Sequence, residues 1–296
     1  MKFKGTFVAT LFLIGMLFSV AHADVKYTIV TKFSFTKSST ESSTEADQTI
    51  DTKIYFVKSN KTRREDITDY AIAPSKEVFI LRCDLKKQFR IDDALKIYTV
   101  SDWAPSGFNS PASESELRED IPEMKTVIHY SIQKLAPEKM NGFDTECYQV
   151  TETDKYSGDS GNRESTNKMK IWVANVQGWQ PCDQEKIALP ASFTHVVTFP
   201  EGRRRFIEEY TGDVDIMNKI SNELSVRTES IIDSGENASN DSTADQNLIL
   251  YSPNEKFDNS LFEIPAGYRE VTSEEYKKLR SEAEVKAIRE SKKLKQ

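Results

Sequence analysis

Histidines, cysteines and one arginine run are the residues of this sequence that could do chemistry. His129 and His195 each stand in a strand-like apolar setting, where a histidine is more often structural than catalytic. The sequence contains no H-x-x-x-H metal-ligand pair, no Cys-x-x-Cys, no Gly-x-Ser-x-Gly and no glycine-rich phosphate loop. It therefore predicts no catalytic residue, no metal site and no cofactor, and we expect a protein that is not an enzyme.

The cysteine count favours one disulfide and one leftover thiol in an oxidising compartment. The three cysteines are Cys83, Cys147 and Cys182. We expect Cys147 to pair with Cys182, because Cys83 lies inside a strand-like run and suits burial. Closing that loop would stabilise the fold by roughly 3–4 kcal/mol on the chain-entropy estimate. The two other pairings, and a fully reduced protein, stay open as alternatives.

Arginine and tryptophan offer weaker indications of a binding site. Arg203, Arg204 and Arg205 could hold a phosphate or carboxylate, although a solvated helix face is the more ordinary interpretation. Trp172 suits a core position inside a strand, whereas Trp103 and Trp179 lie beside loops and could stack on a sugar. None of these residues has a spacing that specifies a ligand.

The N-terminus is typical of a secretory signal. Lys2 and Lys4 precede an uncharged apolar run from Thr6 to Val20, and Ala21-His22-Ala23 places small residues where a signal peptidase reads them. About 15 apolar residues are too few to span a bilayer core of about 30 Å comfortably. We therefore expect cleavage after Ala23 and a periplasmic or secreted protein. An uncleaved membrane anchor is the alternative.

Composition limits the partners of the exported chain. The formal net charge is −7, and it becomes −9 when Lys2 and Lys4 leave with the signal. Such an acidic protein is poorly suited to nucleic acid or to anionic lipid surfaces, which attract positive charge. No later apolar run approaches the length of a transmembrane segment. We expect residues 1–23 to form the signal peptide, residues 24–271 one domain and residues 272–296 a charged C-terminal helix.

Period-2 alternation predicts a β-rich domain. Tyr27, Ile29, Phe33 and Phe35 share one side of a strand, and Ile50 to Phe56 repeats the pattern, which favours a hairpin. Three short strands between Val78 and Val100, joined by four-residue turns, predict an antiparallel meander. Further strands are expected over residues 127–135, 146–151, 169–174, 226–233 and 247–251, and polar loops over 101–124 and 234–246.

Two stretches predict helices. Residues 202–224 mix apolar and charged side chains at roughly helical spacing, which favours one or two short helices interrupted near Gly212. Thr272-Ser273-Glu274-Glu275 fits a capping box, with Thr272 as N-cap and Glu275 reaching back to it. A helix from about Ser273 to Ser291 follows, with Tyr276, Leu279, Ala283 and Ala287 along one narrow stripe.

Three stretches resemble the lipoprotein-sorting superfamily of LolA/LolB-like domains. They are the strand-turn-strand Lys53 to Glu65, the meander Val78 to Val100, and Leu261 to Tyr268, which is similar to the closing F-x-I-P-x-G-Y of such domains. The resemblance implies an α+β fold, namely a strongly curved antiparallel sheet forming an open half-barrel with helices on its concave side. It further implies an apolar cleft that accepts acyl chains of lipids or lipoproteins.

The resemblance leads to a ranked set of functions. We expect a periplasmic, non-enzymatic binding or carrier protein for a lipid, a lipoprotein acyl chain or another apolar ligand. Cleft-lining candidates are Tyr27, Ile29, Phe33, Ile54 and Phe56, for each of which plain core packing is the competing interpretation. A ligand-free envelope interaction or sensor module, with an envelope protein as partner, is the second possibility. A secreted hydrolase is the third and the least supported.

Overall fold

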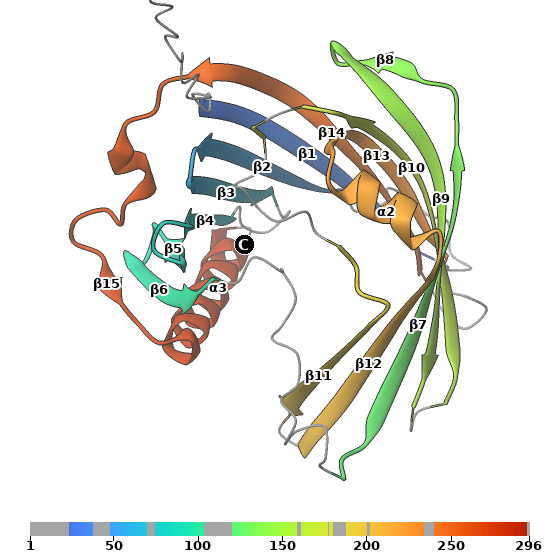
Figure 1. The fold of residues 1–296 in the computed structure, drawn as a ribbon. Helices are drawn as coiled ribbons and strands as arrows, with labels where there is room; N and C mark the ends of the chain where they lie inside the picture. Colours follow the sequence, from blue (N-terminus) through green and yellow to red (C-terminus); the bar gives the residue numbers. More distant parts are fainter. Residues whose placement is uncertain are drawn as a thin grey trace, which may run out of the picture.

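One large β-sheet dominates the computed structural model of the protein (Figure 1). The structure describes residues 24–37, 48–69, 75–103, 120–158, 161–176, 178–179, 188–199, 202–233 and 240–294. The sheet is 15-stranded, in the order β11-β12-β7-β9-β10-β13-β14-β1-β2-β3-β4-β5-β6-β15, and β8 pairs with β9 beside this path. The predicted signal peptide, most of the loop over 101–124 and Cys182 lie outside the described residues.

The N-terminal strands form the hairpin and the meander that alternation predicts. They are β1 (Asp24–Lys37), β2 (Gln48–Lys58), β3 (Lys61–Asp69), β4 (Ser75–Arg82), β5 (Lys87–Asp92) and β6 (Ile97–Asp102). β1 pairs antiparallel with β2, and β4, β5 and β6 pair antiparallel in succession. Lys86 and Lys96 close the two meander turns with φ near +50°, a left-handed conformation that lets a short turn reverse the chain. The predicted hairpin and meander are therefore confirmed.

The remaining strands complete the sheet. They are β7 (Glu123–Lys134), β8 (Glu138–Met140), β9 (Phe143–Ser157), β10 (Arg163–Ala174), β11 (Ser192–Phe199), β12 (Gly202–Gly212), β13 (Leu224–Asp233), β14 (Asn240–Glu255) and β15 (Arg269–Glu270). β9, β10 and β14 are longer than predicted. Residues 240–246, which we assigned to a polar loop, instead continue β14 along β1 and β13, because their Ser, Thr and Ala side chains tolerate a half-solvated strand.

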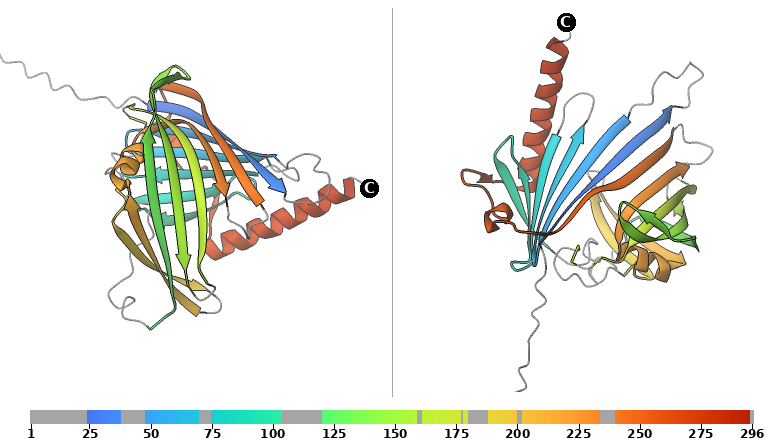
Figure 2. Two further views of the ribbon diagram at one scale, coloured as in Figure 1. Left: turned by 90° about the vertical axis from the view of Figure 1, so that its right-hand side faces the viewer. Right: turned by 90° about the horizontal axis from the view of Figure 1, so that it is seen from above.

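The sheet is mixed rather than purely antiparallel, which corrects the predicted fold class. β12 runs parallel to β7, and β15 runs parallel to β6. In each parallel pair, a strand from later in the sequence lies beside a strand from an earlier part of the chain. The end strands β11 and β15 do not pair with each other, so the sheet is open. Figures 1 and 2 show that it bends strongly between these ends.

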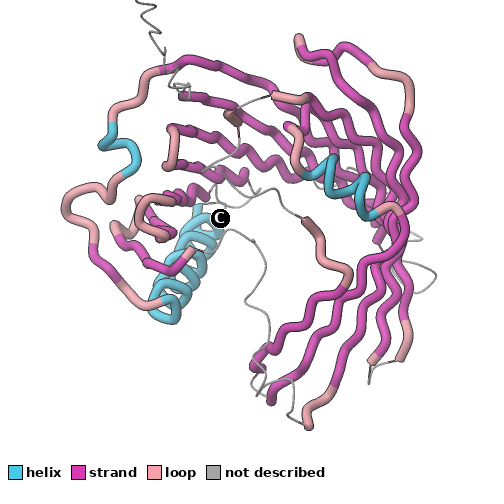
Figure 3. The backbone as a smooth tube through the Cα atoms, in the orientation of Figure 1, coloured by secondary structure: helices cyan, strands magenta, loops and turns pink. Residues whose placement is uncertain are grey.

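Two helices accompany the sheet in the described part of the chain (Figure 3). They are α2 (Val214–Ser221) and α3 (Ser273–Leu294), and a 3-10 turn, η1 (Asn259–Phe262), lies between β14 and β15. α3 begins where predicted, and the backbone N–H of Glu275 donates to Thr272 Oγ1 at 3.1 Å. A full capping box would also have the Glu275 carboxylate accept from the backbone N–H of Thr272. The carboxylate instead accepts from Arg269 Nη1 at 2.9 Å.

The prediction of helix over residues 202–212 is wrong. These residues form β12, in which Phe206, Glu208 and Tyr210 lie on one face while Arg205 and Ile207 lie on the other. The mixture of apolar and charged residues is compatible with the helical period of 3.6 and with the strand period of 2. Pairing with β11 and β7 stabilises the strand. The predicted interruption near Gly212 is confirmed, since α2 starts two residues later.

The predicted disulfide between Cys147 and Cys182 is also wrong. Cys147 is a free thiol, fully buried in the first half of β9 opposite Trp172. Cys83, just after β4, is the described cysteine that is disulfide-bonded. We expected burial in a strand to keep Cys83 reduced. The cysteine that is buried in a strand is instead Cys147, and it is this one that remains a free thiol.

Gly212 provides a direct test of the β12–α2 junction. It adopts a φ of +77°, and a Cβ there would lie 2.1 Å from the Tyr130 carbonyl oxygen. Gly178 has the same φ of +77° but open space around its absent Cβ. We expect Gly178→Ala to lower the free energy of unfolding by about 1–2 kcal/mol through backbone strain alone, and Gly212→Ala to lower it substantially further. Urea denaturation followed by circular dichroism measures both, and equal losses would contradict the close approach.

Candidate functional site

The strand register assigns each side chain to one of two faces of the sheet. Residues directly opposite each other in neighbouring strands share a face. Ile29 is thereby on the same face as Lys53, Asp66 and Glu77 toward β4. In the direction of β9, the same face continues from Thr31 of β1 through successive opposite pairs. Thr31 lies opposite Gln246 of β14, which lies opposite Thr228 of β13. Thr228 lies opposite Ile171 of β10, which lies opposite Tyr148 of β9.

Both helices pack on this same face. Ile220 of α2 lies in a cluster with Tyr148 and Ile171, and Tyr276 of α3 donates its hydroxyl to Glu77 Oε1 at 2.8 Å. We call it the helix-bearing face, and the other one the opposite face. The chain following β14, including Phe257 and η1, covers the opposite face of β2–β5 around Val78, Ile80 and Ile91.

An apolar cluster lies on the helix-bearing face at β1, β2, β10, β13 and β14, with further members from the β8–β9 hairpin and from the chain that follows β10. Its buried members are Val25, Tyr27, Val57, Ala174, Leu224, Val226 and Leu248, and its partly buried members are Ile29, Tyr55, Met140, Phe143, Val176, Trp179 and Tyr251. We call these residues the apolar floor. The Tyr27 and Tyr55 rings stack at a centroid distance of 4.4 Å, and Phe143 meets Tyr251 edge-on at 5.3 Å. No residue of α2 or α3 belongs to this cluster, so the two described helices leave the floor between them.

The five predicted cleft residues divide between the two faces. Tyr27 and Ile29 belong to the apolar floor, and Phe33 lies further along β1 on the same face, opposite Ala244. Ile54 and Phe56 lie opposite Thr28 and Lys26, which places both on the other side of the sheet. Phe56 packs there against the Val78 cluster and meets Phe257 edge-on at 5.6 Å. The assumption that all five share one inner face is wrong, because the two strands were aligned by pattern without their register.

A tyrosine and carboxylate cluster occupies the same face at β7, β9 and β12. Tyr130 donates to Glu152, Tyr156 donates to Asp154 at 3.0 Å, and Tyr210 donates to Glu208 at 2.6 Å. Burial raises the pKa of Glu152, and the charge of Asp154 adds to the shift. Burial also raises the pKa of Asp154, with a further contribution from Glu208. The sequence signal was the alternation Tyr148, Val150, Glu152, Asp154, Tyr156, which continues past the predicted end of this strand.

Glu146 is a carboxylate whose environment lowers its pKa, whereas burial raises the pKa of Glu152 and Asp154. It accepts hydrogen bonds from Lys134 Nζ at 2.7 Å, Lys219 Nζ at 2.5 Å and the Tyr148 hydroxyl at 2.5 Å. These three donors lower the pKa of Glu146 to about 2. Because Lys219 lies in α2, this network ties the helix to β7 and β9.

The histidines, tryptophans and arginines singled out in the sequence do not come together. His129 is exposed and lies 3.1 Å from Thr211 Oγ1, while His195 stacks on Phe206 in the edge hairpin. Trp172 is buried beneath Lys170 and Arg227. Arg205 is buried in β12 and pairs with Glu123, so the helix-face interpretation of the arginine run is wrong. Within the described residues no group of histidine, cysteine and acidic side chains could hold a metal ion.

The sequence matches no model of a known protein family and no curated protein. None of the helices in the described ranges is both long and apolar enough to cross a membrane.

The tyrosine and carboxylate cluster predicts an unusual pH dependence. The pKa of Glu152 is raised above its ordinary 4.5 in the folded protein. Between pH 4.5 and this raised pKa, the folded state therefore holds a proton that the unfolded chain has already released. The free energy of unfolding falls as pH rises through this range. We expect Glu152→Gln to be more stable than the wild type at pH 7, with a difference that disappears as pH drops below 4.5. Urea denaturation between pH 4 and 7 measures the effect.

The matched control is Glu146→Gln, whose sign is reversed. The lowered pKa of Glu146 contributes stability that is present above 4.5 and is lost as pH falls toward 2. With its side chain 37% exposed, we expect the variant to lose about 1 kcal/mol or less at pH 7, since solvent screens such pairs. Two variants with the same sign at neutral pH would contradict the assigned environments.

Proposed function

We propose that the protein is an exported, non-enzymatic binding or carrier protein for a lipid, a lipoprotein acyl chain or another apolar ligand. In this proposal the bent sheet acts as an open half-barrel with α2 and α3 on its concave side. The ligand lies on the apolar floor between the two helices. The periplasmic or secreted location, the cleaved signal and the kinship with lipoprotein-sorting domains are parts of the same proposal.

The position of the apolar floor is the observation that carries the proposal. Seven of its members are only partly buried, and they pack against the seven buried side chains of the cluster. Partly exposed aromatic and aliphatic side chains grouped on one face are characteristic of surfaces that bind a partner or ligand. Each methylene of an acyl chain buried against them would contribute about 0.8 kcal/mol, so a chain of ordinary length could bind without any charged contact.

The margins of the floor suit an elongated apolar ligand. Met140 and Phe143 come from the β8–β9 hairpin, which is fastened over the floor by a hydrogen bond from Asn141 Nδ2 to the Leu248 carbonyl at 2.7 Å. On the other side, β3 and β4 present the ion pairs of Arg64 with Asp66 and of Arg280 with Glu77. An apolar strip bounded by a hairpin and by paired charges favours a ligand that lies along the strip.

Ile29 and Ile54 form a matched pair for testing the floor. Both are half-buried isoleucines in adjacent strands, but Ile29 faces the helices and Ile54 faces away. Titration with the uncharged dye N-phenyl-1-naphthylamine, followed by its fluorescence, measures apolar binding. We expect Ile29→Gln to weaken binding about tenfold, since it removes apolar contact area from the site, and Ile54→Gln to leave it unchanged.

Thermal unfolding of both variants controls for loss of fold. Equal weakening by the two substitutions, at equal stability, would place the dye elsewhere and contradict the floor. A wild-type protein that binds no dye and that releases no lipid on organic extraction would remove the carrier function altogether.

An envelope interaction or sensor module is the second candidate, and α3 is the feature that favours it. The first turns of α3 belong to the fold, because Tyr276 is buried and Arg280 pairs with Glu77 and Asp92. Beyond them the helix is largely exposed and projects away from the sheet (Figure 2). A secreted hydrolase gains no support from any side-chain constellation in the described residues.

Truncation before Ser281 separates the two roles of α3. Removing residues 281–296 keeps Tyr276 and Arg280, so we expect the unfolding midpoint to change little. If α3 recruits an envelope partner, this truncation abolishes co-purification of that partner, whereas dye binding to the floor persists. Removal from Thr272 should instead destabilise the protein, because it deletes the buried Tyr276. Retained partner capture after the shorter truncation would exclude the exposed part of α3 as the interaction site.

A further inference from the structure

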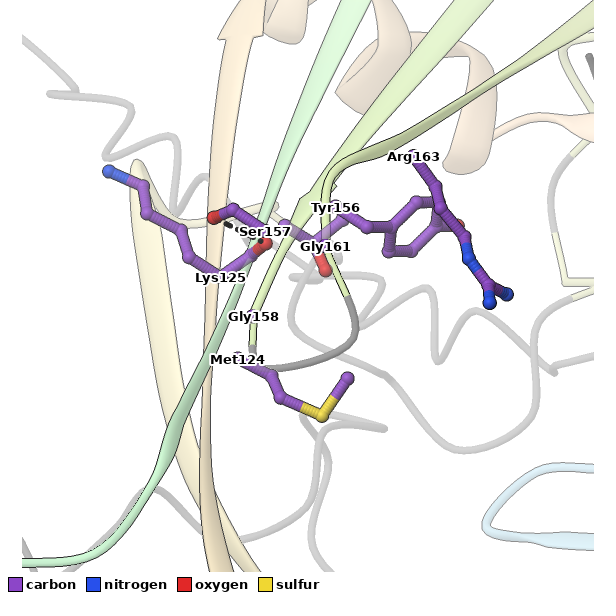
Figure 4. Close-up of a pocket in the computed structure, with 8 residues that line it drawn as sticks. Met124, Lys125, Tyr156, Ser157, Gly158, Gly161 and Arg163 are labelled. Atoms are coloured by element: carbon purple, nitrogen blue, oxygen red, sulfur yellow. Dashed lines mark hydrogen bonds between the residues drawn. The ribbon is translucent and has the colours of Figure 1, made fainter.

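A pocket of about 220 Å³ opens at the ends of β7, β9 and β10 that carry the β9–β10 turn (Figure 4). It is lined by Met124, Lys125, Thr126, Tyr156, Ser157, Gly158, Gly161 and Arg163. A volume below about 300 Å³ suits a small organic molecule rather than a large ligand. The pocket is separate from the apolar floor, which lies at the other end of β9 near Phe143.

The side chains of the pocket sort by face. Thr126, Tyr156 and Arg163 lie opposite one another across β7, β9 and β10 and therefore share the helix-bearing face. Figure 4 shows Met124, Tyr156 and Arg163 on one side of these strands and Lys125 pointing to the other. The ammonium of Lys125 is accordingly paired with Glu209 at 2.7 Å, away from this group.

Among the residues that the structure describes, Arg163 pairs with no carboxylate. Its neighbour in sequence, Glu164, pairs across the opposite face with Lys155 at 3.7 Å, and the nearby Asp154 accepts the Tyr156 hydroxyl. No hydrogen bond or ion pair joins Arg163 to any residue in the described ranges. Several strand arginines that are more buried than Arg163 do face acidic partners: Arg63 with Glu65, Arg82 with Asp84, Arg205 with Glu123 and Arg227 with Asp245. Arg163 is exposed at the start of β10, so its guanidinium is available to pair with an anion that enters the pocket.

The other wall of the pocket is apolar. Met124 presents its thioether, toward which Arg204 Nη1 points at 3.9 Å, and lies opposite Phe206 in the parallel pair of β7 and β12. Gly158 keeps this wall close, because a Cβ there would lie 3.4 Å from Met124 Cγ. Tyr156, which is 39% exposed, has its ring beside Arg163. The pocket thus places a guanidinium beside a methionine and an aromatic ring.

We infer that this pocket binds a small organic anion, whose carboxylate or phosphate group pairs with Arg163 and whose apolar part contacts Met124 and Tyr156. The planar guanidinium can donate two parallel hydrogen bonds to either group, and the thioether adapts to an irregular apolar surface. The site is independent of the carrier function, because it shares no residue with the apolar floor.

Isothermal titration with octanoate tests the assignment, and Arg163→Gln is the decisive variant. Losing one charge-assisted pair should raise the dissociation constant about tenfold. Lys125→Gln is the matched control, since it removes a cation that lines the same pocket but points away, and we expect it to bind octanoate like the wild type. Two further ligands separate the parts of the recognition: 1-octanol lacks the anion, and inorganic phosphate lacks the apolar part. Both should bind more weakly than octanoate.

Each alternative result overturns the inference. Unchanged affinity in Arg163→Gln, or equal losses in Arg163→Gln and Lys125→Gln, would mean that octanoate does not use this arginine specifically. Equal binding of 1-octanol would remove the anion from the recognition, and equal binding of phosphate would remove the apolar wall. Octanoate binding that is weakened by Ile29→Gln but not by Arg163→Gln would assign the ligand to the apolar floor instead.

Discussion

The continuous backbone ladder from β11 to β15 is the constraint on which the other features depend. Because neighbouring strands hold a fixed register, each side chain is committed to one face, and a slip of one residue would exchange the two faces. The ladder carries the apolar floor, the tyrosine and carboxylate cluster and the Glu77 contact of α3 on one side. It carries the Val78 cluster, closed by Phe257 and η1, on the other.

The ladder also contains the irregularities that bend it. β14 shifts register against β1 between Thr28 and Ile29 and again between Asp24 and Val25, and β10 shifts against β13 between Trp172 and Val173. Such bulges raise the local twist and turn a strand away from a flat sheet. All three shifts lie in the strands that build the apolar floor, so the irregularities of the sheet and its half-buried apolar surface coincide in the chain.

Local patterns in the sequence predicted much of the fold, whereas tertiary pairing decided the rest. Alternation identified the β1–β2 hairpin and the β4–β6 meander, and the Thr272 cap located the start of α3, because each signal is contained within a few residues. The sequence of β12 fits a helix or a strand equally well until β7 and β11 pair with it. Nothing local reveals that Ile29 and Ile54 face opposite ways, or that Arg163 pairs with no carboxylate in the described residues, since both depend on how neighbouring strands pair.

Photolabelling is the most direct test of the central claim that apolar ligands lie on the helix-bearing face at the apolar floor. An uncharged alkyl diazirine would be irradiated with the protein, and the labelled residues would be identified by peptide mass spectrometry. The account predicts that labels concentrate on Ile29, Tyr55 and Tyr251, and that excess lipid suppresses them. Labels concentrated instead on the exposed Ile231, Ile249 and Leu250, or spread evenly and insensitive to lipid, would contradict it.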